Sequence, residues 1–270
     1  MNQLSKQKKI QFWALTLLFF ILPVVFLLLK STVLNFGFGR NEDIEFSFIG
    51  WETLFSESQL IHATLVSLGI GALVVLLNLS IGLLAGKALA FYSFKGKSVI
   101  ESLFLLPLIV PLLAIAMGIH VAMIRIGLSD TWIGVVLIHL VPTIPYSIKM
   151  LQSGYASIGT GMLQQAQVLG TNRWHRFFSV ELPLLMPSIR STVFLIFVIS
   201  LSQYVITAII GGGNVVTLAM IYFPFLDSAG STVLAAFSTW FALLPILFYL
   251  SMELLLSLLP YHQNPWRTRL

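Results

Sequence analysis

Few residues of this 270-residue chain are of a type that does chemistry, because only 9% of them are charged and none is cysteine. The absence of cysteine excludes disulfides, thiolate catalysis and cysteine metal ligands. No G-x-S-x-G motif or Ser/His/Asp arrangement is present, so no enzyme activity is expected. The sequence also predicts no metal site, because neither H-x-x-x-H nor H-E-x-x-H spacing occurs among the histidines: His62, His120, His139, His175 and His262.

One short motif has the end of a phosphate-binding loop without its beginning. Gly96-Lys97-Ser98 fits the last positions of G-x-x-x-x-G-K-[ST], but Phe91 occupies the position of the first glycine. The motif also lies in a basic loop that no parallel-sheet strand precedes. We interpret it as a solvated, lipid-facing charge cluster, and we expect no cofactor on this chain.

Four polar residues near residue 200 are candidates for a solute path. They interrupt an apolar stretch, where polar side chains are costly and often functional. Their spacing of three, four and seven positions places them on one face of a helix: Ser200, Gln203, Tyr204 and Thr207. The alternative is that they form interhelical hydrogen bonds that hold a helix bundle together. The same alternative applies to Asn78, His120, His139 and Tyr146.

A polar segment at about 151–186 separates two apolar stretches and contains two predicted short helices. Gly170 ends the first helix, because glycine reaches left-handed backbone conformations at no steric cost. Thr171 or Asn172 can cap the second helix. That helix presents aromatic side chains with arginines beside them: Trp174, Phe177, Phe178, Arg173 and Arg176. Such a surface is typical of a protein interface, although an aromatic belt at the lipid headgroups has the same composition.

The spacing within this segment resembles the EAA loop of permease subunits from binding-protein-dependent ABC importers. The family pattern is Glu-Ala-Ala, three residues, Gly, nine residues and Ile-x-Leu-Pro. Val180 is a conservative replacement for the Ile, whereas Gln164 and Gln165 depart from the Glu and the first Ala. At position 164 we expect a hydrogen bond from Gln to replace the charged contact of the family's Glu at lower strength. Four positions match in type and spacing: Ala166, Gly170, Leu182 and Pro183.

The resemblance implies partners and a mechanism. In this family the loop contacts a separate ABC ATPase, which binds ATP and Mg²⁺. The other implied partners are a second permease subunit, in a hetero- or homodimer, and an extracytoplasmic solute-binding protein, with no nucleic acid. The fifth predicted span and the Gly-rich turn after it, with Thr217-Leu218, are similar to the spermidine/putrescine, ferric-iron, thiamine and sulfate branch of importer permeases, so polyamines are the first candidate solute. ATPase coupling is thereby assigned to Gln164, Ala166, Gly170, Arg173, Trp174, Phe177, Phe178, Leu182 and Pro183.

Composition predicts an all-α integral membrane protein. The chain is 57% apolar and has a mean hydropathy of +0.94, whereas soluble domains are about half apolar and about a quarter charged. A stretch of about 20 apolar residues crosses a bilayer. The coupling helix is expected between the fourth and the fifth transmembrane helix. Six transmembrane helices are predicted, at roughly 11–29, 61–86, 99–123, 131–150, 187–210 and 232–258.

The positions of the positive charges predict the orientation. With the N-terminus inside, only Lys30, Arg40 and Arg125 of the 15 Lys and Arg residues lie outside. The positive-inside rule therefore favours an N-in, C-in arrangement. The expected location is the bacterial cytoplasmic (inner) membrane, as a multi-pass protein in the lipid bilayer.

Prolines and loops complete the predicted architecture. Pro107 and Pro111 each remove a helical hydrogen bond, so the third span is expected to kink, either beside the path or only for packing. We expect a first helix and outer loop at 1–57 and an importer permease domain at 58–260. The coupling loop lies within this domain at about 151–186, and a cytosolic tail follows at 261–270.

Two functions from other classes are the alternatives. A self-sufficient secondary transporter would need paired broken helices in inverted halves and buried ionisable residues. Here only the third span is clearly broken, and the spans contain almost no charges. A membrane scaffold without transport would use the polar segment to bind something other than an ATPase. The favoured hypothesis is a non-catalytic permease subunit that forms the translocation path of an ATP-driven importer.

Overall fold

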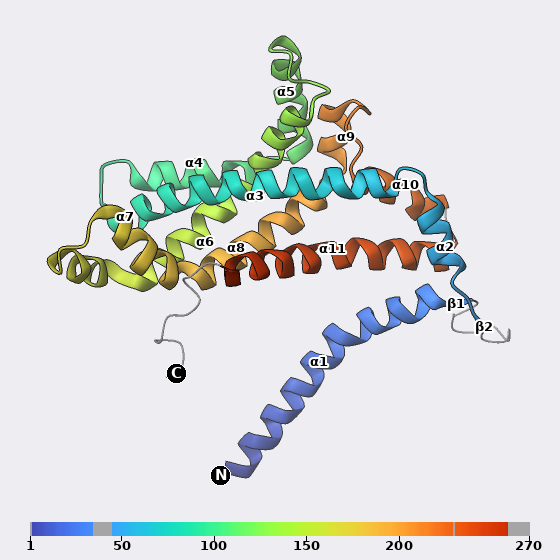
Figure 1. Ribbon diagram of the computed structural model, residues 1–270, viewed down its shortest axis with the longest axis horizontal. Helices are drawn as coiled ribbons and strands as arrows, with labels where there is room; N and C mark the ends of the chain where they lie inside the picture. Colours follow the sequence, from blue (N-terminus) through green and yellow to red (C-terminus); the bar gives the residue numbers. More distant parts are fainter. Residues whose placement is uncertain (1, 35–44, 229, 259–270) are drawn as a thin grey trace. The chain divides into compact units, whose positions relative to one another are not determined.

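The computed structural model describes residues 2–34, 45–228 and 230–258, and most of them are helical (Figure 1). Helices suit a bilayer because they satisfy every backbone polar group within one segment. The predicted tail at 261–270 and Arg40 lie outside the described residues. The helices are α1 Asn2–Thr32, α2 Ile49–Ser56, α3 Leu60–Phe91, α4 Lys97–Ile109, α5 Leu112–Arg125, α6 Trp132–Val168, α7 Arg173–Arg176, α8 Leu182–Leu201, α9 Val205–Gly211, α10 Leu218–Ser228 and α11 Ser231–Leu258, with a π-helical turn η1 at Phe177–Glu181.

The chain divides into two compact units, of which the first comprises 1–61 and 221–244. Within it, strands β1 Val33–Leu34 and β2 Glu45–Phe46 pair in an antiparallel ladder. Phe55 of α2 packs edge-on against Trp240 of α11, with ring centroids 5.6 Å apart. The most apolar part of α1 has no buried residue, as expected of a helix that lipid surrounds. The predicted boundary after residue 57 stays a prediction, because 221–244 belongs to the same compact unit as 1–61.

The second unit comprises 62–220 and 245–270, and it contains the predicted coupling segment. Helix α6 packs along α8, while α9 packs against both α5 and α6. Glycines bring α3 close to its neighbours, because small residues let helix backbones approach. A Cβ on Gly71 would lie 2.6 Å from the ring of Phe197, and one on Gly82 would lie 2.8 Å from Leu151.

Among the described residues, five helices are long and apolar enough to cross a membrane, or up to six if α4 and α5 form one span. These two helices are bent by 99° at a break at Val110 and Pro111, and Pro107 lies within α4. The predicted fifth span is also divided, because α8 ends at Leu201 and α9 begins at Val205. The all-α membrane fold is confirmed, whereas the six-helix count and the N-in, C-in orientation stay predictions.

Candidate functional site

The predicted coupling helix forms the last part of α6. Gly159 has φ 74° and ψ 162°, so a non-helical residue separates 132–158 from 160–168. Leu163 and Ala166 are buried, and the other residues of 161–168 are exposed, including Gln164. The chain therefore presents a short helix that packs on the protein through Leu163 and Ala166 and exposes both amide and apolar side chains on its other face.

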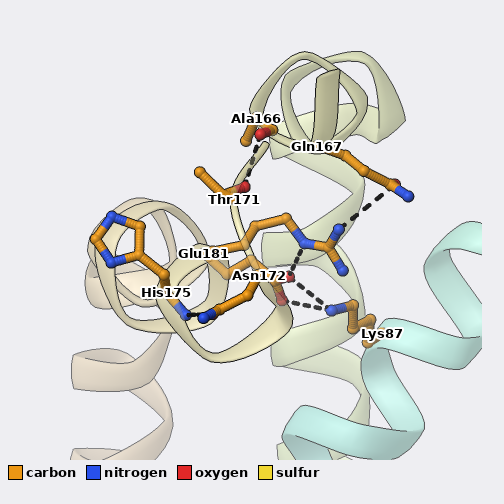
Figure 2. A network of polar contacts seen from close by, with 8 residues as sticks. Lys87, Ala166, Gln167, Thr171, Asn172, His175 and Glu181 are labelled. Carbon is orange, nitrogen blue, oxygen red and sulfur yellow. Dashed lines mark hydrogen bonds and ion pairs between the residues drawn. The ribbon is translucent and has the colours of Figure 1, made fainter. Parts of the chain in front are cut away.

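In the turn after this helix, Gly170 has the predicted left-handed conformation, and Asn172 rather than Thr171 caps the second helix. Gly170 has φ +79°, a left-handed conformation that favours glycine. The hydroxyl of Thr171 donates to the carbonyl of Ala166 at 2.6 Å and closes the turn. Asn172 is the cap of the second helix, because its Oδ1 accepts a hydrogen bond from the His175 backbone N–H at 2.7 Å (Figure 2).

From Arg173 to Leu201 the chain forms one continuous helical rod made of α7, η1 and α8. Its wide π turn ends at Glu181, where the Leu182 backbone N–H donates to the carbonyl of Phe177. Pro183 follows immediately and lacks an N–H, so a regular α-helix would lose a bond here anyway. The rod joins the turn at Gly170 directly to the predicted fifth span.

The start of the rod and the end of the coupling helix carry exposed apolar side chains. Trp174 is 75% exposed and Phe178 51%, and their rings stack with centroids 6.3 Å apart. Phe177 is half-buried and packs edge-on against Phe178. Val168 and Leu169 are 87% and 83% exposed. We call Val168, Leu169, Trp174 and Phe178 the docking surface.

The two arginines predicted beside the aromatic residues have different surroundings. Arg173 is exposed, whereas Arg176 is half-buried and turns back into the protein. Its Nε lies 3.4 Å from Oε1 of Glu181, and its Nη1 donates to Oε1 of Gln167 at 3.5 Å. Arg173 alone of the pair is therefore available at the surface.

Glu181 is the residue that sequence reasoning missed. It is only 1% exposed, and both carboxylate oxygens accept from Nζ of Lys87 on α3, at 2.6 and 2.7 Å (Figure 2). Lys87 also lies 5.8 Å from the ring centre of Tyr155 on α6. The sequence signal that could have revealed this ion pair is the opposite charge of Lys87 and Glu181, each of which lies near the end of an apolar span.

The four predicted path residues do not share one continuous helix. Ser200 and Thr207 are buried on opposite sides of the break between α8 and α9, and both bind His139 of α6. His139 Nδ1 lies 2.9 Å from the Ser200 hydroxyl, and Nε2 lies 2.9 Å from the Thr207 hydroxyl. Gln203 and Tyr204 are half-buried at the break. The hydrogen-bonding alternative therefore describes Ser200, Thr207 and His139.

Two other polar residues of the helices, Asn78 and His120, also have hydrogen-bond partners. Asn78 of α3 donates to the Thr143 hydroxyl of α6 at 2.9 Å. His120 lies 3.0 Å from the hydroxyl of Ser129, and Tyr146 is exposed. Among the residues that the structure describes, no three His, Asp or Glu side chains are placed to hold a metal ion.

Residues 78–268 match the protein family described as "Binding-protein-dependent transport system inner membrane component". A relative in sequence is the molybdenum transport system permease protein ModB of Escherichia coli (strain K12), which is 29% identical over 53% of this chain and 68% of its own length. The spermidine/putrescine permease protein PotC of Haemophilus influenzae is 27% identical over 62% of this chain and 65% of its own. The sulfate permease protein CysT of Escherichia coli (strain K12) is 26% identical over 69% of this chain and 75% of its own length.

A solved structure has the same fold at low sequence identity. It is described as a bacterial ABC transporter involved in the import of the acidic polysaccharide alginate, and it covers 93% of this chain and 96% of its own with a TM-score of 0.70 at 12% identity. The family match spans most of the chain and removes the secondary transporter and the scaffold from consideration. The chain belongs to the binding-protein-dependent transport system inner membrane component family and is a permease subunit of an ABC importer, a multi-pass protein of the inner membrane.

Proposed function

We propose that this permease subunit is coupled to a separate ABC ATPase through residues 160–183, here called the docking segment. The ATPase binds ATP and Mg²⁺ and performs the hydrolysis, and this chain contributes no catalytic residue. A second permease subunit, in a hetero- or homodimer, completes the translocation path. An extracytoplasmic solute-binding protein delivers the solute. Family membership supports these partners, as does a neighbouring structure of an alginate ABC transporter in complex with a periplasmic protein.

The observation that carries the proposal is the exposure of the docking surface. Trp174 and Phe178 form a stacked pair at the surface, and Val168 and Leu169 project from the end of the preceding helix. Exposed polar residues, Gln164, Gln165 and Arg173, lie in the same segment. An aromatic belt marks one end of a span, whereas the docking segment presents exposed groups on both sides of a tight turn and combines aromatic, Arg and amide side chains, as protein interfaces do.

The remaining coupling residues position this surface. Ala166 is buried and anchors the first helix, and Gly170 provides the left-handed turn. Leu182 and Pro183 lie where the rod passes from η1 into α8. Because the rod is continuous, a displacement of Trp174 by the ATPase moves α8 directly, and α8 packs along α6. Such rigid-body motion of packed helices is a standard way to switch between two states.

Two of the predicted path residues are retained in the proposal. Gln203 and Tyr204 lie at the break between α8 and α9, and unwound backbone at membrane depth is tolerated where it is buried in protein or lines a cavity. Ser200 and Thr207 hold the two sides of this break through His139. We therefore assign solute contact to Gln203 and Tyr204 and a supporting role to Ser200 and Thr207.

Co-purification from gently solubilised membranes tests the ATPase contact. The tagged wild-type chain is expected to recover an ATP-binding subunit, and a Trp174→Ala/Phe178→Ala double variant is expected to lose it. Trp132→Ala is the matched control, because Trp132 is also an exposed tryptophan but lies at the start of α6, outside the docking segment. Recovery of the ATPase by the double variant, or its loss from both variants, would contradict the proposal.

The solute class is the second element of the proposal, with polyamines as the first candidate. Similarity to a relative named for spermidine/putrescine transport supports it. Relatives named for molybdenum and sulfate transport make small oxyanions the second candidate. Uptake of labelled spermidine, molybdate and sulfate by cells that contain or lack this chain separates them: loss of spermidine uptake alone supports a polyamine, and loss of molybdate or sulfate uptake overturns it.

A further inference from the structure

We propose that Glu181 is a positioning residue that fixes the docking segment to α3, so that α3 moves together with the ATPase contact. This inference rests on the proposed function of the docking segment. It assigns a role to the ion-pair cluster that the buried Glu181 forms with the half-buried Lys87 and Arg176, which we call the Glu181 clamp.

The burial of Glu181 shows that the clamp is a built feature. An ionised carboxylate that is 1% exposed must be paired, because burial of an uncompensated charge is strongly unfavourable. Lys87 supplies two short charge-assisted hydrogen bonds, at 2.6 and 2.7 Å, and Arg176 a longer contact at 3.4 Å. The carboxylate therefore has partners on both sides, one from α3 and one from α7.

The position of the clamp connects three helices at one point. Glu181 is the last residue of η1, within the rod that begins at the docking surface. Lys87 lies near the end of α3, 94 residues earlier in the chain. Arg176 reaches Gln167 of α6, so the coupling helix is also tied to the cluster. A force on Trp174 is thus transmitted to α3 through Glu181 as well as to α8 through the backbone.

The π turn is a second feature of the same place. Phe177–Glu181 is the one π-helical turn among the described helices, and such turns are frequent at functional sites. The turn lies between the docking surface and Pro183 and ends at Glu181. Without the clamp, this wide turn is where we expect the rod to flex, which would uncouple the docking surface from the spans.

Spin-label distances test the clamp, and the chain is suited to them because it contains no cysteine. Leu84→Cys on α3 and Gln165→Cys in the docking segment are both exposed positions outside the docking surface. In the assembled complex in nanodiscs, the wild-type background is expected to give one narrow distance distribution. The distribution is expected to stay unchanged between the nucleotide-free complex and the complex with ATP and EDTA, because the segment and α3 move as one body.

Neutral variants of the clamp are expected to lose this narrow distribution. Glu181→Gln and Lys87→Met each remove the ion pair between Lys87 and Glu181, and we expect both to broaden the distribution and to make it respond to ATP. The Glu181→Gln/Lys87→Met double variant is expected to regain the thermal stability that each single variant loses, but not the narrow distribution. Narrow distributions in both single variants, or recovery of both properties in the double variant, would overturn the proposal.

A matched control and a separate outcome keep this test independent of the proposed function. Glu253→Gln removes a different ion pair, with Arg190, in the helices of the same unit, and it is expected to leave the label distance unchanged. If no ATPase co-purifies with the wild type, the proposed function fails, and the distance in the permease alone still tests the clamp. In the permease alone, a narrow wild-type distance distribution that Glu181→Gln broadens supports the clamp. Equal distributions for the wild type and Glu181→Gln overturn it.

Discussion

Gly86 of α3 lies so close to Gln152 of α6 that a Cβ on Gly86 would be 2.8 Å from the Gln152 backbone nitrogen. Gly82, one turn earlier, meets Leu151 and Ser147 of α6 in the same way. Gly82 and Gly86 therefore form a packing seam between α3 and α6. The seam ends one residue before Lys87, which donates to Glu181 at 2.6 Å.

Replacement of Gly86 by valine is expected to destabilise the protein by about 1–3 kcal/mol, because added side-chain atoms in a close-packed interior force strain. The matched control is Gly69→Val, since a Cβ at Gly69 meets nothing within 4 Å. Thermal unfolding in detergent measures both variants. Equal melting temperatures for Gly86→Val and Gly69→Val would contradict the observed seam.

Replacement of Gly170 by valine is expected to reduce ATPase recovery strongly while the chain still reaches the membrane. A non-glycine residue in the left-handed region costs roughly 1–2 kcal/mol, and a β-branched residue is the least suited to it. Gly170→Asn should retain most of the recovery, because Asn tolerates this conformation. Western blotting of membranes and co-purification of the ATPase check the result, and full recovery with Gly170→Val would refute the role of the turn.

Replacement of Asn172 by alanine should cost about 1 kcal/mol of local helix stability, the usual effect of losing an N-cap. We expect faster hydrogen exchange at the His175 backbone amide, because this amide donates its hydrogen bond to Oδ1 of Asn172. Asn172→Asp should retain slow exchange, because its carboxylate caps equally well. Slow exchange in the alanine variant would show that packing alone holds α7.

Replacement of His139 by phenylalanine is expected to destabilise the protein by about 1–3 kcal/mol, because the buried hydroxyls of Ser200 and Thr207 lose a partner. Ser202→Ala is the control, since the exposed Ser202 hydroxyl bonds only the carbonyl of Ile199 among the contacts described. Solute selectivity should not change in either variant. A changed selectivity at unchanged stability would return Ser200 and Thr207 to the solute path.

The sequence predicts those features that local signals determine. Apolar runs located the helices, and Gly170 located the turn, because glycine conformation and apolar length act within a few residues. The interruption between Leu201 and Val205 was not predictable, since no proline or glycine marks it. The Glu181 clamp was missed because its partner, Lys87, lies 94 residues away, and only the packing of α3 against the docking segment brings the two charges together.

A photo-crosslinking amino acid at position 174 tests the central claim, that the docking segment contacts the ATPase, most directly. With the reagent at 174, irradiation of native membranes is expected to join the chain covalently to an ATP-binding subunit, identified by mass spectrometry. The same reagent at position 132, another exposed tryptophan, should give no such product. Adducts at 174 with lipid alone, or ATPase adducts at 132 instead, would contradict the account.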